Sequence, residues 1–169
     1  MITELRVQNF KAWKDTGALR LAPLTVFFGT NSAGKSSLGQ LLLMLKQTAQ
    51  LPDRSRVLHP GGDEKTPIDL GSYRELIHQH HADRDLEFEV AWRAPEAVRI
   101  ENALNKKQSL DVDRFRFSCC VGMLDAEKLK CKRFKYTLSQ NEKTVEVRFG
   151  PDPNTPTQYE LIASGYRLR

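Results

Sequence analysis

The pattern of apolar and polar residues predicts strands and one helix in the first 50 residues. Ile2–Phe10 alternates imperfectly and predicts a first strand, and Ala18–Leu21 predicts a short second strand. Leu24–Phe28 is a largely continuous apolar run, which is typical of a strand buried on both faces. Leu38–Gln50 is rich in helix-forming residues and predicts a helix, which Pro52 ends.

The C-terminal half has a different pattern, in which apolar and charged residues alternate. A short helix is expected first, over Ser72–Gln79, with Glu75 at the capping-box position. Alternation with period two then predicts an antiparallel meander, with turns at Asn141–Glu142 and Pro151–Pro156, whereas 95–110 is ambiguous. The alternating segments are Leu86–Trp92, Phe115–Val121, Phe134–Leu138 and Val145–Phe149.

Composition narrows the class of protein. The 169 residues suit a single domain of about 150 residues, and 40% hydrophobic with 28% charged residues is ordinary soluble usage. The longest apolar run, Leu41–Leu45, is far shorter than the ~20 residues that span a bilayer, and the N-terminus has no signal-peptide core. We therefore expect a cytoplasmic protein without a membrane partner. A net charge of +5 and three cysteines without CxxC spacing favour a solvated surface and reduced thiols.

A phosphate-binding motif lies between the apolar run and the helix. The segment Gly29–Ser36 matches GxxxxGK[ST], a strand is expected before it and a helix after it. Such a loop turns backbone N–H groups toward phosphate oxygens, and the helix adds its positive end. The expected nucleotide-binding residues are Gly29, Thr30, Asn31, Ser32, Ala33, Gly34, Lys35, Ser36 and Ser37.

The motif assigns separate roles to its last three residues. Lys35 is expected to reach the β- and γ-phosphates, and the Ser36 hydroxyl to ligate Mg²⁺. Ser37 is expected to donate a bond to the α-phosphate. A GTPase is excluded because Asn105–Gln108 lacks the Asp of an NKxD motif. A small-molecule kinase is disfavoured by the antiparallel pattern downstream and is kept as an alternative.

The opening of the chain resembles the ABC-type ATPases of the RecF/SMC/OLD group. The resemblance rests on Ile2–Trp13 and on Leu24–Ser36, with Asn31 at the third position of the loop. Ser32 replaces the glycine usual in SMC and RecF proteins, and this form is similar to a subgroup of bacterial AAA ATPases that includes the anti-phage Septu ATPases and OLD-like ATPases. Ile68–His78 resembles the same subgroup.

The resemblance implies a fold class and a domain organisation. The expected fold is α/β, the P-loop NTPase lobe of an ABC-type ATPase, with a mixed sheet, a P-loop helix and an antiparallel β-subdomain. Residues 1–169 would form this N-terminal lobe, divided into 1–50, 51–84 and 85–169. Relatives in this group are much longer, so we also expect a chain truncated at its C-terminus.

The same resemblance implies further site residues and partners. Lys11 corresponds to a basic residue near the nucleotide phosphates, Trp13 either covers the adenine or packs, and Gln79 is the nearest candidate for a Q-loop glutamine. ATP and Mg²⁺ are the implied cofactors. Paired ATPase heads would sandwich ATP, with DNA and a nuclease as further partners in an anti-phage function.

Two motifs that this class needs for hydrolysis are not found. Cys119–Glu127 and Leu138–Glu142 superficially resemble a Walker B strand and a signature, but their order is reversed. We therefore expect ATPase activity in a longer intact protein and little activity in this chain alone. A non-catalytic nucleotide-binding module that regulates assembly is the second alternative.

Overall fold

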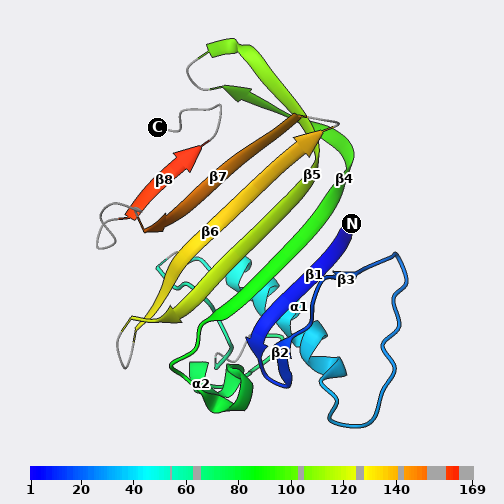
Figure 1. The fold of residues 1–169 in the computed structure, drawn as a ribbon, viewed down its shortest axis with the longest axis vertical. Coiled ribbons are helices and arrows are strands. Elements are labelled where there is room, and N and C mark those ends of the chain that lie inside the picture. The colour runs from blue at the N-terminus through cyan, green and yellow to red at the C-terminus, as the bar shows by residue number, and fades with distance from the viewer. Residues whose placement is uncertain are drawn as a thin grey trace.

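The computed structural model describes residues 1–53, 55–62, 66–102, 105–124, 128–140, 143–151 and 159–163. For residues 102, 105–108, 143 and 161 it describes the backbone alone. The strands in these ranges form one sheet (Figure 1). They are β1 (Ile2–Phe10), β2 (Trp13–Asp15), β3 (Leu19–Arg20), β4 (Leu86–Asn102), β5 (Asn105–Met123), β6 (Leu129–Gln140), β7 (Lys143–Pro151) and β8 (Tyr159–Ala163).

The sheet is an antiparallel meander. Its order is β2-β1-β4-β5-β6-β7-β8, with β3 also paired to β1. The meander predicted from alternating residues is confirmed, but the expected mixed sheet is wrong, because every pairing among the described strands is antiparallel. Within the ambiguous segment, residues 95–102 continue β4 and residues 105–110 belong to β5, past a register shift between Arg93 and Val98. Asn141–Glu142 and 152–156 of the second expected turn lie outside the described residues.

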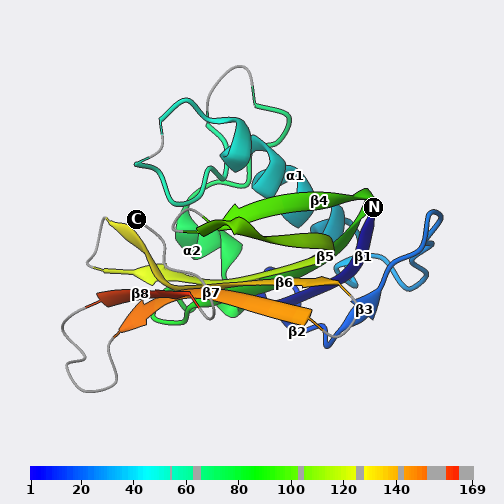
Figure 2. The same cartoon turned by 90° about the horizontal axis from the view of Figure 1, so that it is seen from above.

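The helices cover one face of this sheet, as Figure 2 shows. They are α1 (Lys35–Gln50), α2 (Tyr73–Leu76) and the 3₁₀ helix η1 (His78–His80). Both predicted helices are present, and Ser72 and Glu75 form the expected capping box. In the described part of the chain, no helix combines the length and apolar character needed to cross a membrane.

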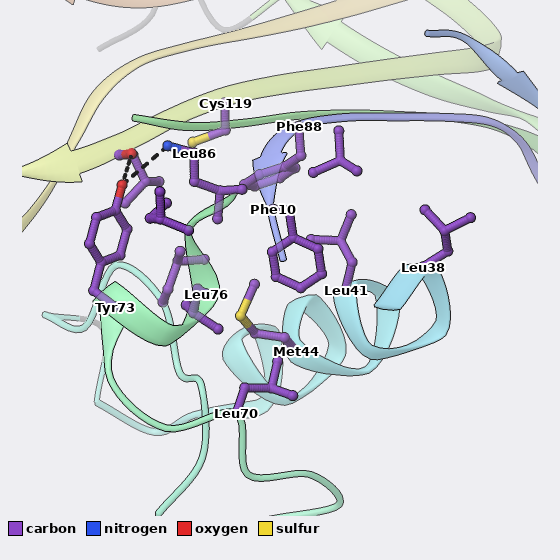
Figure 3. Close-up of a cluster of buried hydrophobic side chains, with 14 of the residues drawn as sticks. Phe10, Leu38, Leu41, Met44, Leu70, Tyr73, Leu76, Leu86, Phe88 and Cys119 are labelled. Carbon is purple, nitrogen blue, oxygen red and sulfur yellow. Dashed lines mark hydrogen bonds between the residues drawn. The ribbon is translucent and has the colours of Figure 1, made fainter. Parts of the chain in front are cut away.

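The core lies between α1, α2 and the first strands of the sheet (Figure 3). Leu38, Leu41 and Met44 recur at helical spacing, are buried, and share a cluster with Phe10 and Val7 of β1. Burying each such side chain stabilises the fold by about 1.5–3 kcal/mol. This packing holds α1 against β1 and so fixes where the helix begins relative to the sheet.

A buried tyrosine ties α2 to the sheet. The Tyr73 hydroxyl donates to the Val121 carbonyl at 2.9 Å and accepts from the Leu86 N–H at 3.1 Å (Figure 3). Burial raises the pKa of Tyr73 to about 12, so the hydroxyl stays neutral and keeps its proton for this bond.

The apolar run before the motif does not form the expected buried strand. Leu24–Phe28 forms no strand, and residues Leu24 and Phe28 are 82% and 90% exposed. A strand buried on both faces needs a neighbouring strand and covering elements, whereas β2 and β3 pair with β1 in the described part of the chain. The prediction was wrong because residue type alone does not supply that neighbour.

Candidate nucleotide-binding site

The motif leads directly into α1, which begins at Lys35. Gly34 is the N-cap, with φ 83° and ψ 10°, a left-handed conformation that favours glycine. No side chain caps this helix and its first turn holds no acidic residue. The positive end of the helix dipole is therefore neither capped nor neutralised by its own first turn.

Several N–H groups of the loop are available to an anion. The Ala33 N–H donates to the Thr30 carbonyl at 3.3 Å, and the Ser37 N–H to the Gly34 carbonyl at 3.1 Å. Within the described residues, the N–H groups of Gly34, Lys35 and Ser36 have no such acceptor. Successive N–H groups at a helix N-terminus are the arrangement that binds phosphate. The residues present therefore fit a nucleotide phosphate.

Lys35 supplies the positive charge at this loop. Its Nζ donates to the Gly29 carbonyl at 2.9 Å and to the Thr30 carbonyl at 2.6 Å, so the side chain folds back over the loop. Gly29 has φ +151° and lies in the region that favours glycine. Ser36 is exposed in the first turn of α1, whereas Ser37 is buried. The exposed Ser36 hydroxyl is the one that solvent and a hydrated cation reach.

The remaining motif residues lie on the outside of the loop. Thr30, Asn31 and Ser32 are exposed, and Ala33 is exposed as well. Ser32 has φ +63°, so the chain also turns through a left-handed residue at this point. The sequence motif and the structure therefore place one continuous exposed loop ahead of the helix.

A contact with Trp13 fixes the start of α1, and the sequence does not indicate it. The indole Nε1 donates to the Gly34 carbonyl at 3.0 Å, across 21 residues of sequence. A Cβ on Gly34 would lie 2.8 Å from Trp13 Nε1 and 2.9 Å from the Ala12 Cβ. Trp13 also packs against the core cluster, which favours packing over the alternative of covering an adenine. Glycine is therefore required at position 34 of the motif for two reasons: its positive φ and the close approach of Trp13 and Ala12.

Lys11 lies in the turn between β1 and β2, next to Ala12 and close to Trp13. The turn after β1 joins α2, because the Lys11 N–H donates to the Leu76 carbonyl at 2.7 Å. His78 Nδ1 lies 2.8 Å from the Lys11 carbonyl oxygen. Lys11 is half-buried and adjacent to Ala12, which approaches Gly34. Its expected closeness to the loop is therefore compatible with the backbone path.

The sequence model of the family described as AAA ATPase domain matches residues 1–158. The chain belongs to this family. No curated protein matches it. Membership of the AAA ATPase domain family suggests nucleotide binding and, in general, ATPase activity.

Two histidines of η1 in this AAA ATPase domain contact backbone carbonyl groups. His80 Nδ1 lies 3.2 Å from the Arg74 carbonyl oxygen, and His78 contacts Lys11 as above. The described residues hold no group of three or more His, Cys, Asp or Glu side chains that suits a metal ion. Gln79 lies in η1 with φ +57°, and its role as a Q-loop glutamine stays a prediction.

The two rejected motif look-alikes fall in antiparallel strands of the AAA ATPase domain. Cys119–Met123 belongs to β5 and Leu138–Gln140 to β6. Asp125–Glu127 and Asn141–Glu142, which carry their acidic residues, lie outside the described residues.

Proposed function

We propose that Gly29–Ser37 binds ATP together with Mg²⁺. The observation that carries the proposal is the uncapped N-terminus of α1, where the N–H groups of Gly34, Lys35 and Ser36 have no acceptor within the described residues. In this proposal Lys35 exchanges the Gly29 and Thr30 carbonyls for β- and γ-phosphate oxygens. The Ser36 hydroxyl ligates Mg²⁺, which neutralises charge on the phosphates when bound.

The proposal includes hydrolysis in an assembled, ABC-type form. Two ATPase domains would self-associate around ATP, so that each supplies charge stabilisation to the site of the other. The exposed apolar side chains of Leu24, Val26 and Phe28, directly before the loop, support a working form in which this segment is covered. A DNA-directed or anti-phage function with a nuclease partner is the part supported only by the sequence resemblance.

The variant Lys35→Ala tests nucleotide binding. A hydrogen bond to a charged group contributes about 1.5–3 kcal/mol, so ATP affinity should fall about 10- to 150-fold. The matched control is Lys46→Ala, which removes a lysine from the same helix outside the motif. Calorimetric titration with ATP and Mg²⁺ measures both, and thermal unfolding should change little because Lys35 is partly exposed.

The outcomes separate binding from hydrolysis. Equal ATP affinity of Lys35→Ala and the native chain would refute the site. If the monomer binds ATP without hydrolysing it, and hydrolysis appears only under conditions in which ATP increases the sedimentation coefficient, the result supports hydrolysis by an assembly. Binding without turnover in every oligomeric state would instead support a non-catalytic module.

A further inference from the structure

A register change in the sheet brings two cysteines to the same face. Over the paired segment of β5 and β6, Cys119 is opposite Phe134 and Cys120 is opposite Arg133. The register then shifts, so that Val121 is opposite Cys131. The extra residue in β6 is Lys132, a β-bulge that reverses the face of the residues beyond it. Cys131 therefore lies on the side of the sheet that Cys119 and Val121 share.

The bulge is held by a charged contact. Lys132 Nζ donates to Asp85 Oδ1 at 2.7 Å, directly before β4. A Cβ on Gly122 would lie 2.0 Å from that same Asp85 oxygen, so the carboxylate sits close against the β5 backbone. The irregular register is thus supported by a defined contact.

The two thiols are in contact. Cys119 Sγ lies 3.6 Å from Cys131 Sγ, and both side chains belong to or pack against the core cluster. Cys119 is 9% exposed and Cys131 is half-buried, so Cys131 is the thiol that a small reagent reaches first. The hydrogen bond from Cys119 lowers the pKa of Cys131, although burial opposes it. Two thiols in contact, one of which has a lowered pKa, form the arrangement of a reactive dithiol.

The third cysteine differs from this pair. Cys120 faces the opposite side of the sheet, where its Sγ lies 3.6 Å from Asp85 Oδ2. Burial raises the pKa of Cys120 to about 11, which keeps it protonated. The chain therefore contains its own unreactive reference thiol, adjacent in sequence to Cys119.

We propose that Cys119 and Cys131 form a reversible dithiol–disulfide site that is oxidised by peroxides. The Cys131 thiolate attacks one peroxide oxygen, the O–O bond breaks, and Cys131 becomes a sulfenic acid while hydroxide leaves. The Cys119 sulfur then attacks the Cys131 sulfur, and the sulfenic oxygen departs as water with the Cys119 proton. Two thiols are oxidised by two electrons, and hydrogen peroxide is reduced to two waters. A dithiol reductant reverses the step.

The product would join β5 and β6 across the bulge. This disulfide would close a loop between positions 12 residues apart and would link β5 to β6. It would lie near Val121 of β5, whose carbonyl accepts the hydrogen bond from Tyr73. Cross-linking a loop restricts the unfolded chain, so the oxidised protein should have a higher Tm than the reduced protein.

The experiment treats the reduced protein with hydrogen peroxide and maps its peptides by mass spectrometry. The expected product is one internal disulfide, seen as the loss of two hydrogen atoms and removed by dithiothreitol. Because Cys119 and Cys120 are adjacent, the Cys120→Ser variant identifies the partner and should form the bridge at the native rate. Cys119→Ala should instead stop at a Cys131 sulfenic acid, which a dimedone-type reagent traps.

Each result decides the proposal. A bridge that contains Cys120, overoxidation of Cys131 without a bridge in the native chain, or no reaction in the folded protein would overturn it. Should a variant fail to fold by circular dichroism, the native protein still decides the question, because fragmenting its oxidised peptide between Cys119 and Cys120 shows which of the two is linked to Cys131.

Discussion

Replacing Gly34 by alanine tests how the sheet positions the nucleotide loop. The new Cβ would lie 2.8 Å from Trp13 Nε1 and 2.9 Å from the Ala12 Cβ, at a residue with φ +83°. The left-handed conformation costs an L-residue about 1–2 kcal/mol, and the added methyl in a packed contact about 1–3 kcal/mol. We therefore expect Gly34→Ala to lower the free energy of unfolding by about 2–5 kcal/mol.

Two other glycines separate these contributions. Gly17 has φ +62°, and a Cβ added there would meet no atom within 4 Å, so Gly17→Ala should cost only the conformational part, about 1–2 kcal/mol. Gly39 lies inside α1 with open space around it, so Gly39→Ala should stabilise the protein by about 0.5–1 kcal/mol. The three variants differ from the native chain by the same single methyl group.

Urea unfolding followed by far-UV circular dichroism measures all three free energies, and ATP titration follows the loop. Gly34→Ala should also weaken ATP binding, because relieving the clash between the new Cβ and Trp13 moves the start of α1 away from that side chain. An unfolding free energy for Gly34→Ala equal to that of Gly17→Ala would refute the reasoning, since the close contact would then carry no energy.

Two further variants test contacts that hold the site and the core. Tyr73→Phe should lower the free energy of unfolding by about 1–3 kcal/mol, because it leaves the buried Leu86 N–H without its acceptor. The control Tyr136→Phe, at a residue that is 38% exposed, should change the free energy of unfolding by no more than about 0.5 kcal/mol. The pKa of Tyr73 is raised by burial from 10 to about 12, so its stabilising contribution is complete below pH 10 and is lost as pH rises through 12; urea unfolding of the native chain and of Tyr73→Phe at several pH values measures this difference. Trp13→Phe keeps an aromatic ring but removes the N–H that donates to Gly34, and should weaken ATP binding a few-fold in calorimetric titration; unchanged affinity would assign Trp13 to packing alone.

Much of the fold follows from short-range patterns. A run of helix-forming residues predicted α1, the Ser72–Glu75 capping box predicted α2, and alternation predicted the meander that becomes β4–β7. These signals are local, because each depends on residues that are only a few positions apart in the sequence. Strand β8 and the parts of β4 and β5 at residues 95–102 and 105–110 carry weaker alternation and were not predicted.

The candidate site divides in the same way. The loop, the helix start and Lys35 follow from GxxxxGK[ST], whose residue types are dictated by backbone conformation and charge. The contact between Trp13 and Gly34 does not follow, because nothing within the motif specifies which distant side chain packs against it. Leu24–Phe28 shows the opposite error, since its composition is that of a buried strand and its surroundings leave it exposed.

By itself, the sequence predicted most of the helical and extended segments and a candidate phosphate-binding loop. Only the tertiary structure decided what those segments touch: Trp13 at the start of α1, and Cys131 beside Cys119 after the bulge at Lys132. The physical reason is range. Backbone conformation depends on neighbours in sequence, whereas register and close approach depend on how whole strands and helices pack, and one extra residue in a strand reverses every side chain beyond it.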